Sequence, residues 1–457
     1  MRAQKTLGRA LLLFLAAATL SVEAHAQAPA PPYVPTPDPN PDNIPIIVAD
    51  MPGNRLTRFT DMGGSNYETG PIAAGLAFSA PWHVSATCSG QFFVADRDNN
   101  RIVRMNNLAG DGWTTYSGPP SAPFSQLQQG SVGGVISATQ DAQGRIYIMN
   151  SSSGIVRIDD MTGAGYTKFG PNASGQAGDF NGAKVLIFDP QGRMLISDTA
   201  NNRIVRMDDF TGQNWTTYGS GGPGVGQFGA PEGLALDPQG RIYIADHSNH
   251  RIVRIDDMTG AGWVSFGSFG MVDNNTLTGA VGQLDEPHDL AVTDSGRIYI
   301  ADTGNGRIVR IDDMNGNGWA TFGNRGKQPG TPGTPQCPET REGHACAPPG
   351  KWEFIAPKGL RIDPAYLNRP AAPASVTASP GATTVTLAWT PSLSAGISSY
   401  LINVGSAPGV TDVRQAETVG TTVTMTDFAP GTYYVRVQAK RPCGISPASA
   451  EIAVRLP

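Results

Sequence analysis

Four of the six histidines in this sequence fall near the ends of a repeated strand pattern, and imidazole both binds metals and carries protons near neutral pH. They are His83, His247, His250 and His288. Three imidazoles with one open coordination position can bind zinc and activate a water molecule. We therefore predict a divalent metal site of His83, His250 and His288, with His247 as an alternative to His250. The competing interpretation is that all four are polar residues at a rim.

Charged side chains and one indole occur at equivalent positions of the same pattern. Glu232 and Asp289 are carboxylates that could act as a general base or as ligands. Lys184 and Lys358 are cations that could hold an anionic substrate, and Trp82 offers an aromatic face. Each residue alone is a weak indication, because an exposed charge is usually only solvated.

A strand pattern that recurs six times must position these residues. Each copy has a short strand of β-branched and aromatic residues ending in Asp, then a polar turn, then a second strand such as Arg-Ile-Val-Arg. Asp suits the turn because its carboxylate can accept from the backbone two residues on, and Asn tolerates left-handed backbone. The Asp, or Asn in the third copy, stands at positions 50, 96, 150, 198, 246 and 302, a period of 46 to 56 residues.

Each copy also has an aromatic strand after this pair and a short apolar strand before it. Four strands at this period are typical of the blades of a β-propeller. The first copy lacks its apolar strand, but residues 354–364, after the sixth copy, match residues 228–238 position for position. We therefore predict an all-β fold with a six-bladed β-propeller over residues 44–366, closed by a C-terminal strand that joins the N-terminal blade.

In a propeller, the starts of the inner strands and the turns after the Asp face one end of the central channel, where ligands usually bind. The copies differ most at the start of the inner strand, although the rest of the repeat agrees. This variation predicts a common scaffold with one specialised end, which we call the mouth. Its predicted residues are Trp82, His83, Lys184, Glu232, His247, His250, His288, Asp289 and Lys358.

The unit resembles the NHL repeat, with an apolar strand, an Asp-x-x-Gly turn, Ile-Tyr-Ile-Ala-Asp at 242–246 and Asn-x-Arg-Ile at 249–252. The resemblance implies a six-bladed propeller. It implies no single activity, because NHL propellers include binding platforms, sensor domains and a few lyases. A metal site of three histidines occurs in the peptidyl-hydroxyglycine lyase, an NHL-like propeller that this chain resembles in its frame.

The C-terminal residues 374–457 have a different pattern, with alternating strands at the spacing of a β-sandwich. Trp389, the Pro-Gly-Thr-Tyr sequence at 430–433 and the closing segment 444–449 resemble a fibronectin type III domain. Such a domain is expected to space, dock or bind. Residues 367–373 are the predicted linker.

The N-terminal residues 1–26 have the features of a secretory signal peptide. Arg2, Lys5 and Arg9 are followed by an apolar run at 11–20 and by Ala-His-Ala at 24–26 as a cleavage site. Residues 27–43 form a proline-rich, extended leader. A signal peptide predicts a secreted or periplasmic protein, and no later stretch has the length of apolar residues that crosses a bilayer.

Export allows disulfide bonds between the four cysteines. Cys337 and Cys346 flank one short polar loop, so we predict a disulfide between them. A metal site that includes His344 is the sharper alternative, although a fourth ligand at the usual spacing is missing. Cys88 and Cys443 could pair with each other or remain free.

The charge pattern argues against nucleic acid as a partner. The net charge of the chain is −5, and removal of a signal peptide with a charge of +2 leaves −7. Arginines recur in register with acidic pairs, which predicts structural pairing between or within blades. The acidic segment 312–318 could bind calcium through its oxygens, but a hairpin turn fits better because the terminal Glu of a calcium loop is missing.

Two hypotheses about function follow. The first is an exported binding or scaffold protein that presents the mouth to a protein, peptide or glycan partner. The alternative is a secreted metal-dependent lyase or hydrolase with its site at the same mouth, with zinc or calcium as the metal.

Overall fold

The computed structural model describes residues 44–325 and 353–457, with gaps at 61, 63–65, 72–74, 88–89, 121–123, 125–133, 151–153, 171–178, 272–279, 355, 363–371, 393–396, 442–443 and 447. The predicted signal peptide, the leader, most of the linker and all four cysteines lie outside the described residues. The predicted Cys337–Cys346 disulfide therefore stays a prediction.

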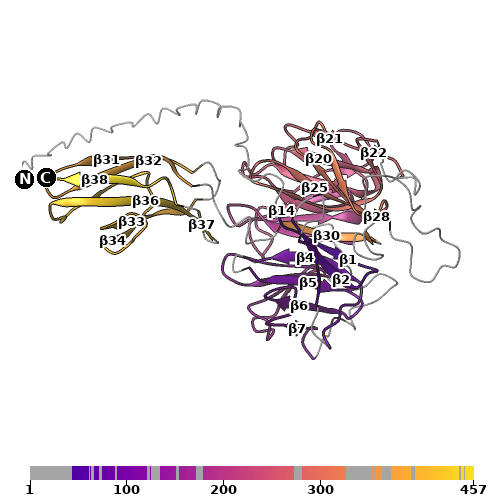
Figure 1. Cartoon of the computed structure of the whole chain (residues 1–457). Helices are drawn as coiled ribbons and strands as arrows, with labels where there is room; N and C mark the ends of the chain where they lie inside the picture. Colours follow the sequence, from indigo (N-terminus) through magenta and orange to yellow (C-terminus); the bar gives the residue numbers. More distant parts are fainter. Residues whose placement is uncertain are drawn as a thin grey trace, which may run out of the picture. The chain divides into compact units, whose positions relative to one another are not determined.

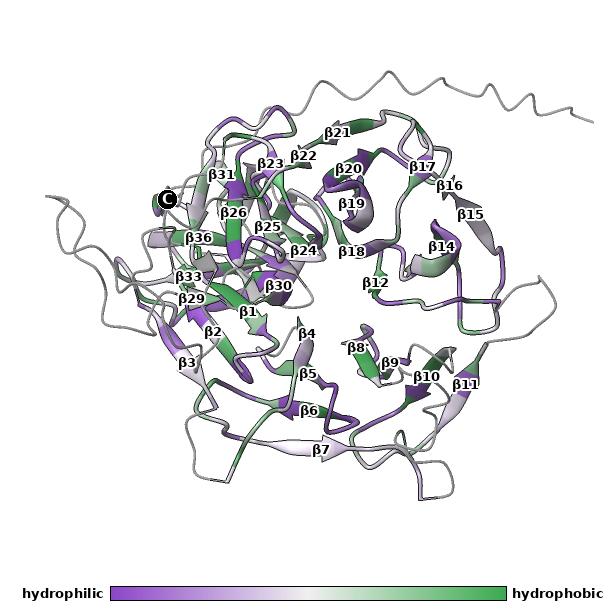
Figure 2. Cartoon of the chain, turned by 90° about the vertical axis from the view of Figure 1, so that its right-hand side faces the viewer, coloured by the Kyte–Doolittle hydropathy of each residue, from purple (hydrophilic) through white to green (hydrophobic). Residues whose placement is uncertain are grey.

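Six four-stranded antiparallel sheets surround a central axis, as Figure 2 shows. This is the predicted six-bladed β-propeller. From the inner to the outer strand, the first blade is β30(Pro357–Ile362)-β1(Ile46–Asp50)-β2(Arg55–Phe59)-β3(Glu68–Gly70) and the second is β4(Pro81–Ala86)-β5(Phe92–Asp96)-β6(Arg101–Met105)-β7(Thr114–Tyr116). The third blade is β8(Val135–Gln140)-β9(Ile146–Asn150)-β10(Gly154–Ile158)-β11(Thr167–Phe169) and the fourth is β12(Leu186–Phe188)-β13(Met194–Asp198)-β14(Arg203–Met207)-β15(Thr216–Tyr218). The fifth blade is β18(Pro231–Leu236)-β19(Ile242–Asp246)-β20(Arg251–Ile255)-β21(Val264–Phe266) and the sixth is β24(Pro287–Val292)-β25(Ile298–Asp302)-β26(Arg307–Ile311)-β27(Ala320–Phe322).

The ring closes through the first blade, as predicted. Strand β30 pairs with β1 in antiparallel register, with Ile362 opposite Ile46 and Gly359 opposite Ala49. In Figure 1 the orange β30 lies beside the indigo β1, although the two strands are more than 300 residues apart. Three short parallel pairs connect outer and inner strands: β16(Ser220–Gly221) with β17(Gln227–Phe228), β22(Ser268–Phe269) with β23(Gln283–Leu284), and β28(Asn324–Arg325) with β29(Glu353–Phe354).

Burial explains the residue types along each blade. The strand that ends in Asp is buried along its whole length, as in Ile242–Asp246, because both of its faces pack against neighbouring blades. The next strand, such as Arg251–Ile255, exposes its arginines partly and buries its Ile and Val residues. β-branched residues suit these strands because they pack well on a pleated surface.

A buried Asp fixes the turn of each blade and the start of its inner strand. Asp246 accepts hydrogen bonds from Arg251 Nε at 2.8 Å and Asn249 Nδ2 at 2.8 Å, and from the backbone N–H of Gly229 at 2.6 Å. Five blades have this Asp–Arg pair, whereas the third has Asn150. The arginine that starts the second strand therefore pairs within its blade, but with the buried Asp and not with the acidic pair that follows the strand.

The acidic pairs that follow the second strand form hairpin turns. Asp313 accepts hydrogen bonds from the backbone N–H of Asn315 at 2.8 Å and from Asn317 Nδ2 at 2.7 Å. Asp257 makes the same kind of contact with Thr259, whose backbone N–H lies at 2.8 Å. These carboxylates satisfy the backbone of a tight turn, which is a structural role.

The C-terminal domain is a two-sheet β-sandwich. One sheet is β31(Ala374–Pro380)-β32(Val385–Thr390)-β35(Thr422–Met425), and the other is β34(Arg414–Thr418)-β33(Ser399–Gly405)-β36(Gly431–Arg441)-β37(Gly444–Ile445), with β38(Ile452–Leu456) also paired to β36. The core contains Trp389 against Tyr400, with ring centroids 5.3 Å apart. Tyr433 donates to the carbonyl of Ala429 at 2.9 Å, a tyrosine corner typical of this fold.

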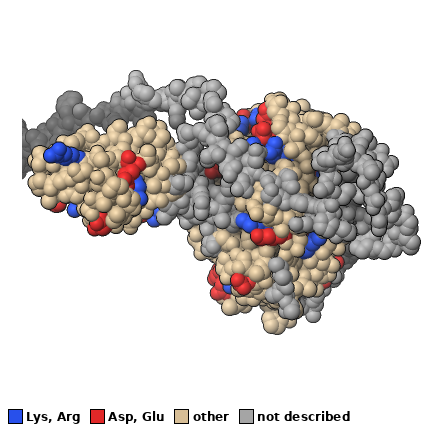
Figure 3. Space-filling model, viewed as in Figure 1, with Lys and Arg blue, Asp and Glu red and all other residues tan. Residues whose placement is uncertain are grey.

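Among the described residues, no helix has the length and apolar character needed to span a bilayer. On the face drawn in Figure 3, most of the described surface is neither acidic nor basic, and the Lys, Arg, Asp and Glu side chains are scattered in small groups.

Candidate functional site

The mouth is built on an irregularity at the start of the inner strands. In β4, β8, β24 and β30 the ladder skips one residue directly after the first, and in β18 it skips between Pro231 and Leu234. A β-bulge leaves its extra residue unpaired and re-aims its side chain. The skipped residues include Trp82, Glu232, His288 and Lys358.

Three of these side chains form a chain of contacts across consecutive blades. His288 Nδ1 lies 2.5 Å from Glu232 Oε2, and His288 Nε2 contacts Lys358 Nζ. Glu232 and His288 are buried, whereas Lys358 is only partly buried. The carboxylate and imidazole therefore form the floor of the mouth, and the ammonium lies between this floor and solvent.

Three cations converge on the indole of Trp82. Lys184 Nζ and Lys358 Nζ each lie 4.9 Å from the ring centroid, and Arg97 Cζ lies at 4.7 Å. Glu232 Oε1 is 3.8 Å from Lys184 Nζ and balances part of this charge. Cations at this distance are attracted by the ring quadrupole.

Electrostatics fix the protonation of this cluster. Burial lowers the pKa of His288 to about 4, and Glu232 only partly opposes the shift. Burial also lowers the pKa of Lys358 to about 8, against the opposing effect of Glu232. For Glu232 itself, burial raises the pKa, but contacts with His288 and Lys184 outweigh burial and hold it well below its usual range. At neutral pH His288 is therefore neutral, donates its Nδ1 hydrogen to Glu232 and accepts one from Lys358 at Nε2.

One group of side chains in the described part of the chain has the spacing of a metal site. Donor atoms of Glu232, His247 and His288 lie within 4.8 Å of one another. The His247 ring lies 4.5 Å from that of His288, centroid to centroid. However, both nitrogens of His288 already take part in contacts, one of them with the ammonium of Lys358. A cation at a ligand nitrogen opposes a metal ion, so the group as it stands fits hydrogen bonding better than coordination.

His83 and Asp289 lie in a second layer, because each follows the skipped residue of its strand. His83 Nε2 is 2.9 Å from Arg361 Nη2, and Arg361 Nη1 is 3.0 Å from Asp289 Oδ2. Burial and the charge of Arg361 lower the pKa of His83 well below its usual value. The backbone N–H of Leu360 also donates to Asp289, at 2.8 Å. These contacts among His83, Arg361 and Asp289 link neighbouring inner strands next to the residues of the mouth.

His250 is directed to different partners from His247. Its backbone has φ of 53°, the left-handed conformation that Asn takes at the same place in three other blades. His250 Nδ1 lies 3.3 Å from Asp285 Oδ1 and accepts the backbone N–H of Glu286 at 3.1 Å. His83, His250 and His288 thus contact three different carboxylates, Asp289, Asp285 and Glu232, and are not brought together as one ligand set.

Two arginines at the site had not been predicted from the sequence. Arg97 follows the buried Asp of its blade, which is the place that His247 occupies in the fifth blade. Arg361 is in the middle of an inner strand, where the equivalent residues of other blades are small or apolar. Arg97 and Arg361 each differ from the residues at the equivalent positions of other blades, so a comparison of the six copies could have found them.

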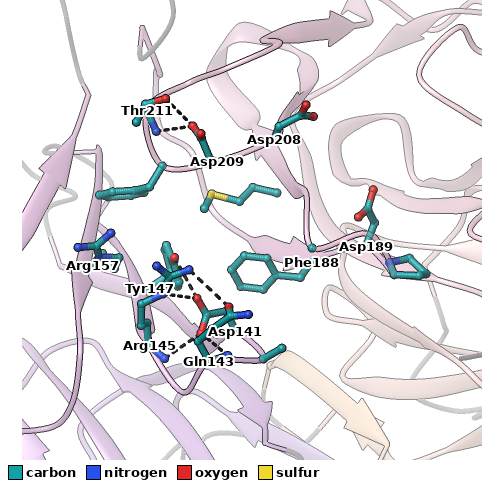
Figure 4. A pocket seen from close by; sticks show the side chains of 15 residues that line it. Asp141, Gln143, Arg145, Tyr147, Arg157, Phe188, Asp189, Asp208, Asp209 and Thr211 are labelled. Atoms are coloured by element: carbon teal, nitrogen blue, oxygen red, sulfur yellow. Dashed lines mark hydrogen bonds and ion pairs between the residues drawn. The ribbon is translucent and has the colours of Figure 1, made fainter. Parts of the chain in front are cut away.

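A separate cleft of roughly 330 Å³ lies between the third and fourth blades. Figure 4 shows Phe188 at its centre and Arg157 and Asp208 at its edges. Asp141 is bonded to Arg145 Nε at 2.6 Å and to Tyr147 Oη at 3.1 Å, as the dashed lines indicate. The residues of the Asp141 turn therefore satisfy one another, and the residues that line the cleft do not include those of the mouth.

Comparisons with known proteins agree with this architecture. Residues 228–255 and 284–311 match the NHL repeat, and residues 371–455 match the fibronectin type III domain. The chain thus carries NHL repeats in an all-β propeller and a fibronectin type III domain. No curated protein matches the chain.

Several solved structures are similar to this chain at low identity. A virginiamycin B lyase from Staphylococcus aureus is 16% identical, with a TM-score of 0.36, over 80% of this chain and 92% of that one. A protein of unknown function from Bacteroides caccae is 16% identical, with a TM-score of 0.42, over 61% and 93%. The extracellular domain of a B. thetaiotaomicron protein described as a one-component system is 13% identical, with a TM-score of 0.41, over 91% and 56%. These likenesses are too distant to carry function.

Proposed function

We propose that this protein is an exported binding protein whose mouth holds an anionic segment of a protein, peptide or glycan partner. The observation that carries the proposal is the meeting of Arg97, Lys184 and Lys358 over one indole, with Glu232 as the carboxylate in ion-pair range of Lys184. A carboxylate of the partner would offset part of the remaining positive charge, and the face of Trp82 would stack against a sugar or an apolar group. The fibronectin type III domain would act as a spacer or second contact.

A matched pair of glycan probes tests the proposal. We expect an oligogalacturonide to bind in isothermal titration calorimetry and its methyl ester, which lacks the charges, to bind at least about tenfold more weakly, as loss of one charge-assisted contact predicts. Lys184→Gln should weaken binding of the acid form, whereas Lys168→Gln should not. Lys168 is an exposed lysine on the outermost strand of the third blade and serves as the control. A glutamate-rich peptide and its glutamine counterpart test the peptide class in the same way.

Equal binding of the acid and the ester, or equal effects of the two lysine variants, would contradict the proposal. Absence of binding to both the acidic glycan and the acidic peptide would count against an anionic partner.

The alternative is a metal-dependent lyase or hydrolase at the same mouth, and the spacing of Glu232, His247 and His288 is the observation in its favour. Two imidazoles and one carboxylate would suit zinc better than calcium. The contact between His288 and Lys358 argues against it. Stoichiometric zinc in protein purified without a histidine tag, lost in His288→Ala, would favour the alternative over the binding protein.

A further inference from the structure

Lys358, His288 and Glu232 stand in the order of an activated nucleophile, its base and the group that orients the base. The Lys358 amine contacts His288 Nε2, and His288 Nδ1 lies 2.5 Å from Glu232 Oε2. This sequence of contacts is the general signature of nucleophilic catalysis, with lysine in the place of the nucleophile. Simple anion binding would require the ammonium but would not require a buried imidazole and carboxylate behind it.

The surroundings of Lys358 oppose a positive charge on its amine. Lys358 shares the face of the Trp82 ring with two other cations, since Lys184 Nζ lies 4.9 Å and Arg97 Cζ 4.7 Å from the ring centroid. Glu232, 3.8 Å from Lys184 Nζ, offsets part of this charge. The buried His288 meets the ammonium with its Nε2 and can accept a proton there. A lysine next to other cations in a site removed from water is a potential nucleophile.

We propose that Lys358 forms an imine with an aldehyde or ketone that carries a carboxylate, such as a 2-oxo acid, and that His288 transfers the protons. Lys184 and Arg97 would hold the carboxylate above the indole of Trp82, so this inference rests on the anion binding proposed above.

The reaction balances with the groups present. The Lys358 ammonium transfers a proton to His288 Nε2 as its nitrogen attacks the carbonyl carbon, and Glu232 stabilises the developing imidazolium through Nδ1. The C–O π electrons move to oxygen, and a proton moves from nitrogen to oxygen to give the carbinolamine. His288 returns its proton to the hydroxyl group, water leaves, and the nitrogen lone pair forms the C=N bond of a protonated imine. Ammonium and carbonyl compound thus give iminium and water, with no external oxidant or reductant.

Lys184 provides a contrast within the same site. Lys184 Nζ approaches Glu232 at 3.8 Å and the Trp82 ring at 4.9 Å. The neighbour of Lys184 Nζ is a carboxylate, whereas Lys358 Nζ contacts an imidazole nitrogen that can accept its proton. Lys358 is therefore the lysine expected to react first.

Reductive trapping tests this inference on the full chain. Glyoxylate is added with cyanoborohydride at neutral pH, and peptide mass spectrometry follows the modification of each lysine with time. We expect Lys358 to be modified at least about tenfold faster than exposed Lys168, and His288→Asn to slow only Lys358, by roughly 10²-fold, the usual contribution of acid–base catalysis. Thermal unfolding of His288→Asn shows whether the variant remains folded, and Glu232→Gln serves as a second variant with the imidazole intact.

Glycolate distinguishes imine formation from anion binding. It has a carboxylate that can compete for the anion site but no carbonyl group that could form an imine. Slower trapping at Lys358 in the presence of glycolate supports both the anion site and the imine. Equal rates at Lys358 and Lys168, together with oligogalacturonide binding that depends on Lys184, would overturn the imine and leave the proposed function standing. Fast trapping at Lys358 that glycolate does not slow would support the reactive lysine and overturn the anion site.

Discussion

Replacing Lys358 by Met should make the protein more stable at neutral pH. The pKa of Lys358 falls from an ordinary value of 10.5 to about 8 because the side chain is largely removed from water. Each pH unit of such a difference corresponds to 1.36 kcal/mol, so the charged amine lowers stability by about 3 kcal/mol compared with an exposed lysine. Met is similar in length and needs no hydration, but it leaves His288 Nε2 without its donor, which costs about 1 kcal/mol. The expected net gain at pH 7 is therefore about 2 kcal/mol.

The stability gained by Lys358→Met should decrease as the pH rises. Below pH 8 the amine is protonated in both the folded and the unfolded protein, and the full penalty is present. Between pH 8 and 10.5 the unfolded chain binds a proton at Lys358 that the folded protein has lost, so the stability of the unmodified protein rises with pH in this window. Above the window the penalty is gone, and Lys358→Met should be less stable than the parent by about the lost hydrogen bond.

Urea unfolding followed by far-UV circular dichroism at about pH 7, 9 and 11 measures this difference, because other groups titrate alike in both proteins. Lys168→Met is the control, and the effect of this exposed substitution should stay within about 0.5 kcal/mol at each pH. A Lys358→Met variant that is less stable than the parent at pH 7, or a difference that does not change with pH, would refute the reasoning. Either result would mean that the ammonium is stabilised in the mouth.

Three further substitutions test the fold, each by thermal or chemical unfolding. Asp302→Ala leaves Arg307, which is 2% exposed, without its counter-charge and should cost about 3–5 kcal/mol; a cost near 1 kcal/mol would show that water reaches the arginine. Gly233→Ala places a Cβ atom 2.5 Å from the Cα of Asp289 and should cost about 1–3 kcal/mol, unless the inner strands can separate freely. Tyr433→Phe removes the tyrosine-corner hydrogen bond and should lower the stability of the sandwich by about 1 kcal/mol, with the propeller transition unchanged as the internal control.

The fold could be predicted because each blade carries its own local signals. The strand Ile242–Asp246 and the turn after it contain β-branched residues, a buried Asp and a left-handed residue, all of which act within a few positions of one another. The closure of the propeller ring could be predicted for a different reason. Residues 354–364 repeat the inner strand of other blades, and a lone inner strand has a partner only in the first blade.

The composition of the mouth was predicted better than its geometry. Repeat alignment indicates that Trp82, Glu232, His288 and Lys358 share a position, and their strands start at the same end of the ring. The repeat alignment does not show which histidine of the fifth blade lies with these four residues at the mouth. His247 and His250 flank one tight turn, and the left-handed backbone of His250 directs its ring to Asp285, so only His247 meets His288.

The positions of the histidines in the sequence therefore did not indicate which of them come together in this chain. Each of the predicted ligands is engaged by a charged neighbour that belongs to another blade, and Arg361, the neighbour of His83, breaks the pattern of its strand. Such contacts depend on the packing of six inner strands against one another, which no local pattern encodes.

The bulges explain how one frame can support a specialised site. A residue that the ladder skips makes no pair with the next strand, so its side chain can change with little effect on the sheet. The adjacent residues have no such freedom: Gly233 and Gly359 are held to glycine because the backbone of a neighbouring inner strand lies within 3 Å of where a Cβ atom would be. Variation at Trp82, His288 and Lys358 is thus largely uncoupled from the fold. Burial of Lys358 beside His288 lowers stability by about 3 kcal/mol compared with an exposed lysine, so the fold would gain from an apolar residue at this position, and the lysine is consistent with the role proposed for it at the mouth.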